Sequence, residues 1–184
     1  GAASSSAIDY RMLTAAEAGG AFGEAVASLG DWDGNGVHDI VIGQPGSTTG
    51  GSIHIVLLGP GASLVNDLSV ADDGSTSWFS DLALGENPVA FGSAIVSLGD
   101  VDGDGLNDIA VGDPLALDGL GLVHLIAVKY APIGTSLTTS NLGTIRTSDF
   151  GPANAEAASF HFGAVLAVRG GANADGGFQL LSTV

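Results

Sequence analysis

The chain has 184 residues, enough for a domain with its own core, and 45% of them are hydrophobic, which excludes a disordered acidic tail. Its formal net charge of −16, with 4 Lys and Arg residues against 20 Asp and Glu residues, argues against nucleic acid and anionic membrane surfaces as partners, because both require a basic face. The sequence contains no cysteine, which excludes disulfides and thiol chemistry, and no apolar run approaches the roughly 20 residues that span a bilayer.

The predicted elements are short β-strands separated by tight turns. The 30 glycines favour turns, Lys, Glu, Arg and Gln are scarce, and Val, Ile, Ser and Thr are plentiful, so an all-β fold is expected. Residues 1–21 are predicted to form a short strand, Ile8–Leu13, and a linker. In a first unit, residues 22–90, strands are expected at Phe22–Gly30, Ile40–Gly43 and Gly51–Leu58, with one more within Leu64–Phe79.

The same pattern starts again at Phe91 and a third time at Phe162. The three Phe-Gly pairs are 69 and 71 residues apart, which indicates a repeated unit within one domain, residues 1–184. In the second unit, residues 91–161, strands are expected at Phe91–Gly99, Ile109–Gly112, Gly121–Val128 and Thr144–Thr147, with a polar loop at Thr135–Ser140. The third unit, residues 162–184, is partial and degenerate, with strands expected at Phe162–Val168 and Leu181–Val184.

An acidic loop follows the first predicted strand of each full unit. Loop 1, residues 31–39, reads Asp-Trp-Asp-Gly-Asn-Gly-Val-His-Asp, and loop 2, residues 100–108, reads Asp-Val-Asp-Gly-Asp-Gly-Leu-Asn-Asp. Carboxylates this close together repel one another unless a hard cation lies between them, and calcium takes about six to eight oxygen ligands. The predicted calcium ligands are the side chains of Asp31, Asp33, Asn35 and Asp39 with the Val37 carbonyl, and the side chains of Asp100, Asp102, Asp104 and Asp108 with the Leu106 carbonyl.

Three other interpretations of these loops compete with calcium. An EF-hand needs a bidentate Glu at loop position twelve, where this chain has Ile42 and Val111, and EF-hands and dockerin-type loops both need a following helix. A turn that is merely rich in Asp and Gly does not explain why the loop recurs at the same distance from Phe-Gly. Magnesium is an alternative ion, although it demands stricter octahedral geometry.

The copies of the loop differ in charge. Loop 1 has Asn35 where loop 2 has Asp104, so we expect calcium to bind more weakly to loop 1. The corresponding positions of the third unit hold Gly171, Asn173, Asp175 and Gln179. With a single carboxylate, this third copy is predicted to be empty, so the chain is expected to bind two calcium ions.

The order of these motifs resembles the FG-GAP repeat of the integrin α-subunit β-propeller and its bacterial relatives. Phe-Gly is followed by Asp-x-Asp-Gly-Asn/Asp-Gly-x-x-Asp and then by Ile-x-Val/Ile-Gly-x-Pro. The resemblance implies β-propeller-type blades, two full and one partial, in which the acidic loop joins the first two strands and holds calcium. The family's Gly-Ala-Pro is Gly43-Gln44-Pro45 and Gly112-Asp113-Pro114 here. Integrin-type propellers have seven repeats, so this chain is not expected to close a ring alone.

Other polar residues carry weaker signals. The run Asp73–Ser77 has the spacing of a metal-dependent adhesion site but lacks the preceding buried strand, so a polar loop is expected. The histidines His54 and His124 occupy equivalent places and are predicted to be packed, and Trp32 is predicted to pack rather than to stack on sugars. No catalytic motif stands apart from the acidic loops, so the chain is predicted not to be an enzyme.

The sequence therefore predicts a secreted or cell-surface, calcium-stabilised structural protein without membrane insertion. Copies of the chain are expected to assemble head to tail, into a filament or a ring, when the strand Ile8–Leu13 of one copy completes the open last blade of the next. One alternative is a fragment of an adhesin whose propeller binds a protein or glycan ligand. A second alternative is an accessory module of a secreted enzyme.

Overall fold

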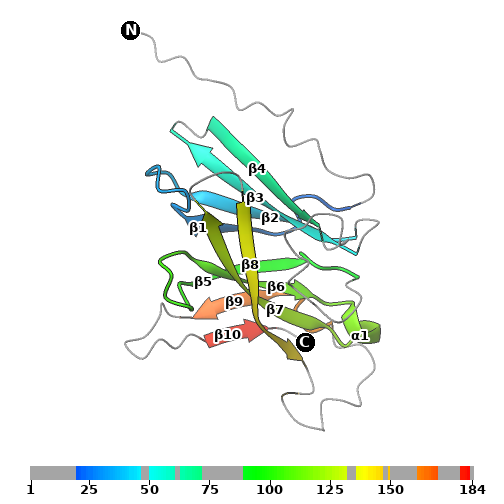
Figure 1. The fold of residues 1–184 in the computed structure, drawn as a ribbon. Helices are drawn as coiled ribbons and strands as arrows, with labels where there is room; N and C mark the ends of the chain where they lie inside the picture. Colours follow the sequence, from blue (N-terminus) through cyan, green and yellow to red (C-terminus); the bar gives the residue numbers. More distant parts are fainter. Residues whose placement is uncertain are drawn as a thin grey trace.

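The computed structural model describes residues 20–46, 50–60, 63–71, 89–131, 136–146, 149, 161–169 and 179–182. These residues form three separate antiparallel sheets that follow one another in chain order and do not close into a ring (Figure 1). The expectation of a β fold whose blades do not close within one chain is confirmed. Among the described residues, no helix is long and apolar enough to cross a membrane.

The first two sheets are four-stranded meanders, each with its strands in sequence order. The first sheet consists of β1 (Val26–Gly30), β2 (Asp39–Gln44), β3 (Ser52–Gly59) and β4 (Ser63–Ala71). The second consists of β5 (Ala94–Gly99), β6 (Asp108–Asp113), β7 (Leu122–Ala131) and β8 (Ser136–Arg146). The third sheet contains β9 (Leu166–Arg169) and β10 (Gln179–Ser182).

The expected strands correspond closely to the observed ones, with two corrections. The segment Thr135–Ser140 was predicted to be a polar loop, but β8 already begins at Ser136 and pairs with β7 along its length. Its many Thr and Ser residues suit a strand, because β-branched side chains fit a pleated surface. A short helical turn, α1 (Ala116–Gly119), also separates β6 from β7. The predicted strand Ile8–Leu13 lies outside the described residues.

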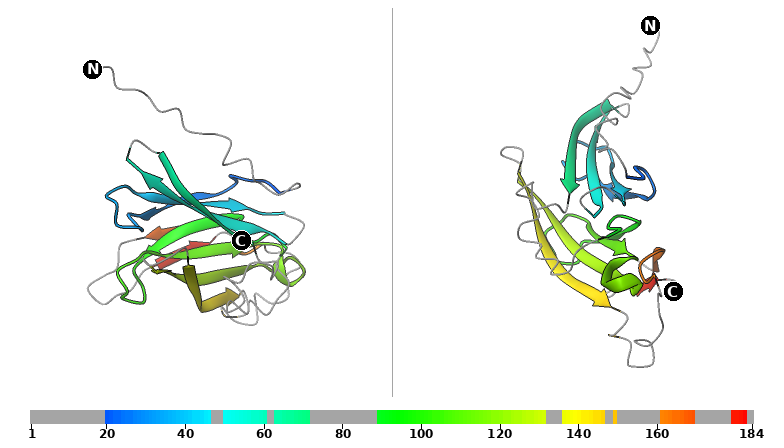
Figure 2. Two further views of the ribbon diagram at one scale, coloured as in Figure 1. Left: turned by 45° about the horizontal axis from the view of Figure 1, so that its top comes forward. Right: turned by 90° about the vertical axis from the view of Figure 1, so that its right-hand side faces the viewer.

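The sheets pack face to face through two hydrophobic clusters, and Figure 2 shows the first sheet stacked on the second. The cluster between the first two sheets contains buried side chains from both, including Val41, Ile55 and Ile109. The cluster between the second and third sheets contains Leu98 and Phe162. The second sheet lies between the two clusters, so β6 has buried apolar residues on both faces, which explains why it is a continuous apolar run rather than an alternating one.

The Phe-Gly and Gly-x-Pro motifs meet where one sheet joins the next. The N–H of Gly92 donates a hydrogen bond to the carbonyl of Gly112 in its own unit. On the other side, a Cβ built on Gly43 of the preceding unit would lie 2.0 Å from the Gly92 oxygen. Phe91 forms a parallel bridge with Gly51, and Phe162 repeats this bridge with Gly121. The motif glycines are required because two backbones approach too closely for any side chain.

Candidate metal centre

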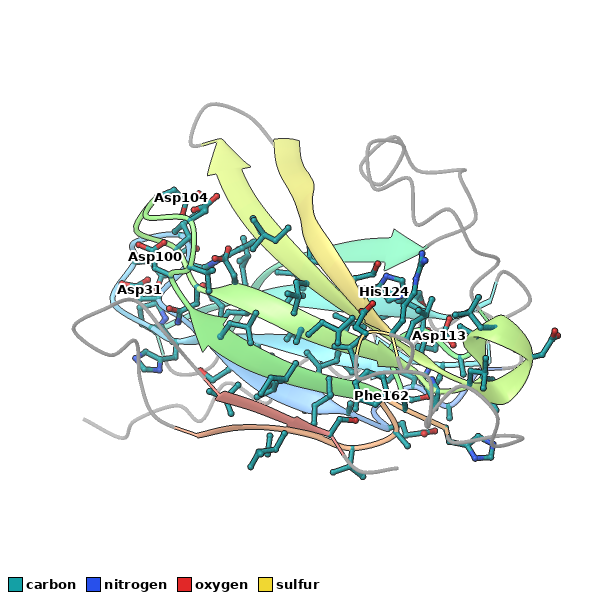
Figure 3. All side chains as sticks on the ribbon, turned by 90° about the horizontal axis from the view of Figure 1, so that it is seen from below. Asp31, Asp100, Asp104, Asp113, His124 and Phe162 are labelled. Atoms are coloured by element: carbon teal, nitrogen blue, oxygen red, sulfur yellow. The ribbon has the colours of Figure 1, made fainter. Side chains whose placement is uncertain are left out.

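Loops 1 and 2 lie at the same end of the stacked sheets, where Figure 3 shows Asp31, Asp100 and Asp104 near one another. Loop 1 joins β1 to β2, and loop 2 joins β5 to β6. The register of each pair shifts just before the loop, between Ser28 and Gly30 and between Ser97 and Gly99. Such a bulge bends the strand and leaves one residue outside the ladder, so both loops start from the same local geometry.

Each loop brings three carboxylates together. One oxygen each from Asp31, Asp33 and Asp39 lies within 4.8 Å of the other two, and Asp100, Asp102 and Asp108 form the same arrangement in loop 2. These two triads could bind metal ions. Their donors are all oxygen atoms, and neither loop contains a Lys or Arg to balance the charge, so a hard cation such as calcium fits the donor set.

The last carboxylate of each triad is buried and closes the base of its loop. The Asp39 Oδ2 accepts a 2.7 Å hydrogen bond from the Trp32 N–H, and the Asp108 Oδ2 accepts one of the same length from the Val101 N–H. The Asp39 Oδ1 also accepts a 2.8 Å bond from the Leu58 N–H at the end of β3. These backbone donors hold the carboxylate in position independently of a bound ion.

The first carboxylate of each triad gathers the backbone of the loop around itself. The N–H of Gly36 donates to the Asp31 Oδ2 at 2.9 Å, and the N–H of Gly105 donates to the Asp100 Oδ2 at the same distance. In loop 2, the N–H of Asp104 also donates to the Asp100 Oδ1 at 3.0 Å. The chain is thus wrapped around the first carboxylate, and glycines with positive φ make this tight path accessible.

The fifth position of each loop stabilises the turn that follows it. The Asn35 Oδ1 accepts the Val37 N–H at 2.9 Å, and the Asp104 Oδ1 accepts the Leu106 N–H at the same distance. The Asn35 amide nitrogen donates to the Leu58 carbonyl at 2.8 Å. The predicted roles of these two side chains, and of the Val37 and Leu106 carbonyls, as metal ligands stay predictions. The third copy, around residues 171–178, lies outside the described residues.

One side chain of each loop contacts the sheets, and only the first of these contacts was predicted from the sequence. Trp32 is only 3% exposed and belongs to the cluster between the first two sheets, which confirms packing over sugar stacking. Asn107 donates a 2.8 Å hydrogen bond from its Nδ2 to the Leu29 carbonyl, 78 residues away in the chain. The sequence shows a side-chain hydrogen-bond donor at position eight of loop 2, but it does not identify the acceptor.

The equivalent histidines lie in β3 and β7, and Figure 3 shows His124 away from the labelled loop residues Asp31 and Asp100. Both are buried, as predicted, and each meets a phenylalanine edge-on, His54 with Phe22 and His124 with Phe91. Burial, followed by the charge of Arg146, lowers the pKa of His124 to about 4. Burial and packing against an aromatic side chain support a structural role for both histidines.

A hydrogen-bonding residue, Gln44 in β2 and Asp113 in β6, ends the second strand of each of the first two sheets. The Gln44 Oε1 lies 2.9 Å from the His54 Nε2, while the Asp113 carboxylate accepts the N–H groups of Val89 and Ala90. Burial raises the pKa of Asp113, although those backbone hydrogen bonds act in the opposite direction. Asp113 thus fixes the segment that leads into the second Phe-Gly pair.

The fold and the loops define a mostly β repeat protein whose two four-stranded sheets each carry an acidic loop between their first two strands. The FG-GAP repeat profile matches residues 91–126, the segment that contains loop 2. Integrin alpha-3 from Mus musculus is 32% identical over 120 residues, covering 62% of this chain and 10% of the relative. Integrin alpha-3 from Cricetulus griseus matches with the same identity and coverage. The match thus spans about a tenth of the length of these curated relatives.

These similarities agree with the order of motifs and with the antiparallel sheets. The chain is an FG-GAP repeat protein, related to the repeats of the integrin alpha N-terminal propeller.

Proposed function

We propose that this chain is an extracellular, calcium-stabilised module of propeller-type blades with a structural and adhesive role rather than a catalytic one. The observation that carries the proposal is the pair of carboxylate triads at equivalent positions of two consecutive blades. The relationship to integrin alpha-3 supports an extracellular location, where calcium is abundant. An ion in each loop would tie the first strand of a blade to the second and balance the buried Asp39 and Asp108.

Thermal unfolding with calcium, with magnesium and with a chelator tests this proposal. A ligand that binds only the folded state adds about 2.7 kcal/mol of stability at 100 times its Kd, so the Tm should rise with calcium concentration. The double variant Asp33→Ala with Asp102→Ala removes one exposed or half-exposed carboxylate from each triad and should abolish this rise. The control Asp118→Ala removes an exposed carboxylate outside both loops. A calcium response that the double variant retains would refute metal binding at the loops.

As a second function, we propose that copies of the chain assemble head to tail through the third sheet. In the described part of the chain, β10 has one hydrogen-bonded neighbour, β9, so its outer edge could accept a strand from another copy. The outer face is apolar: Ala167 lies opposite Leu181, and the Leu181 side chain is 55% exposed. The repeat-equivalent pair in the second sheet, Val96 and Ala110, packs toward the third sheet.

Light scattering in calcium and in chelator tests the assembly. We expect species larger than a monomer in calcium, and we expect Leu181→Lys to shift them toward the monomer by placing a charge on the contact face. Leu115→Lys is a matched control, because Leu115 is 43% exposed and belongs to neither the loops nor the third sheet. A monodisperse monomer in both conditions would exclude self-assembly and would favour a following segment of a longer polypeptide as the cover of this face.

A further inference from the structure

Loop 2 reaches the first sheet through the side chain of Asn107. Its Nδ2 donates a 2.8 Å hydrogen bond to the carbonyl oxygen of Leu29. Leu29 lies where the register of β1 shifts, so it is outside the β1–β2 ladder and its carbonyl can accept a side-chain donor. Gly30 and Asp31 follow directly, and Asp31 is the first carboxylate of loop 1. The contact is close, since a Cβ built on Gly30 would lie 2.9 Å from the Asn107 Nδ2.

Asn107 is equally well connected to its own loop. It stands between Leu106, whose side chain packs against the cluster that contains Trp32, and Asp108, the buried carboxylate of the loop 2 triad. An ion bound by that triad would fix the backbone of residues 106–108. Asn107 therefore contacts the first sheet two residues before Asp31 of loop 1, and Leu106 packs against the cluster that the first two sheets share.

The two loops are not equivalent in this respect. The residue of loop 1 that corresponds to Asn107 is His38, and its side chain is exposed. Asn107 is half-buried at the junction of the first two sheets. This position is therefore a bridge in loop 2 and an ordinary surface position in loop 1.

We propose that metal binding at loops 1 and 2 is positively coupled and that Asn107 is the positioning residue that transmits the coupling. This inference rests on the proposed function, because it requires that both loops bind ions. An ion in loop 2 orders Asn107, which holds Leu29 and Gly30 in place. Loop 1 then loses less conformational freedom when its own ion binds. Linkage makes the effect reciprocal, so an ion in loop 1 favours binding at loop 2 to the same extent.

The buried Trp32 provides a reporter for loop 1. The chain contains two tryptophans, so a Trp78→Phe background makes Trp32 the sole tryptophan signal. Calcium titrations followed by Trp32 fluorescence are compared in this background and after Asp102→Asn, Asn107→Ala and both changes together. Calorimetry in parallel counts the ions bound. Asp118→Asn, an exposed carboxylate outside the loops, controls for the lost charge.

We expect Asp102→Asn to weaken calcium binding at loop 1 by about fivefold when Asn107 is present, in line with the net value of one hydrogen bond. In the Asn107→Ala background, the same change should weaken it by less than about twofold, because a double-mutant cycle isolates the interaction. If circular dichroism shows that Asp102→Asn does not fold, the Asn107→Ala variant alone tests the proposal. It should weaken calcium binding at loop 1 by about fivefold.

Three results would overturn the proposal in different ways. If both ions bind but the calcium affinity of loop 1 is unchanged in Asp102→Asn, the loops are independent. Where Asp102→Asn does not fold, an unchanged loop 1 affinity in Asn107→Ala leads to the same conclusion. If Asp102→Asn acts equally with and without Asn107, the coupling exists but Asn107 does not transmit it. If calorimetry detects no calcium binding in the Trp78→Phe background, the proposed function and the coupling both fail.

Discussion

The carboxylate of Asp39 accepts a 2.7 Å hydrogen bond from the backbone N–H of Trp32, seven residues earlier in the chain. Its second oxygen accepts the Leu58 N–H at 2.8 Å, and the side chain is fully buried. Asp39 is also a member of the loop 1 triad. Asp39 therefore has a structural role that does not depend on a bound ion. The exposed Asp31 of the same triad has a smaller structural role.

Asp39→Ala is expected to destabilise the protein even in the presence of a chelator. The change leaves two backbone N–H groups at the base of the loop without their acceptor, which costs about 2–4 kcal/mol in total. Asp31→Ala should cost about 1 kcal/mol or less in chelator, because water replaces the carboxylate at an exposed position. Urea unfolding of both variants measures the difference, and equal losses would contradict the separate role of Asp39.

Asp104→Asn is expected to give loop 2 the charge of loop 1. Asp104 is exposed and its Oδ1 accepts the Leu106 N–H, a contact that an Asn Oδ1 can reproduce, as Asn35 does in loop 1. The substitution removes one negative charge near the ion, so calcium affinity at loop 2 should fall by about tenfold or more. Calorimetry measures the change. An unchanged affinity would show that the charge of Asp104 does not contribute to calcium binding, and Asp118→Asn, at an exposed carboxylate outside both loops, controls for the lost charge.

Gly43→Ala is expected to disrupt the junction between the first and second sheets. Its Cβ would lie 2.0 Å from the Gly92 carbonyl oxygen, and a methyl group at this distance forces two backbones apart. We expect a loss of about 3 kcal/mol or more, at the upper end of single substitutions. Gly99→Ala is the contrasting control, because its site is open and only its positive φ of 76° is unfavourable, at about 1–2 kcal/mol. Comparable losses in urea unfolding would contradict the steric explanation.

The recurring Phe-Gly pairs were enough to predict most strands, because each unit must repeat the same contacts with its neighbour. The Asp spacing likewise predicted that the carboxylates of each loop come together, and three of them do so in each loop, since a short loop has few ways to wrap around one point. The sequence did not reveal why position 43 must be glycine, because the reason is the close approach of the Gly92 carbonyl in the next unit.

Contacts between units account for what the sequence did not reveal. The hydrogen bond from Asn107 to Leu29 depends on how two sheets stack and on a bulge in β1, and neither has a signature in the sequence. The full length of β8 was missed because the polar run Thr135–Ser140 is typical of a loop, whereas its pairing with β7 overrides that local preference. Pairing of this kind is a long-range property that local composition does not encode.

The stability of the second sheet is expected to fall in acid because of His124. Burial, followed by the charge of Arg146, lowers the pKa of His124 from 6.5 to about 4. The folded state therefore favours the neutral ring. This contribution is fully present above pH 6.5 and is lost as the pH falls from 6.5 to about 4. The loss amounts to about 3 kcal/mol at low pH, at 1.36 kcal/mol per unit of pKa difference.

His124→Phe should remove this pH dependence. Neither ring nitrogen of His124 has a hydrogen-bond partner in the part of the chain that the structure describes, so an apolar ring can take its place against Phe91. Urea unfolding in chelator gives the free energy of unfolding of both proteins at pH 7 and pH 4.5. Comparing the two proteins cancels the contribution of the loop carboxylates, because both proteins contain them. His161→Gln, at an exposed position, should leave the profile unchanged. If His124→Phe loses as much stability between the two pH values as the unaltered protein, the acid sensitivity has another origin.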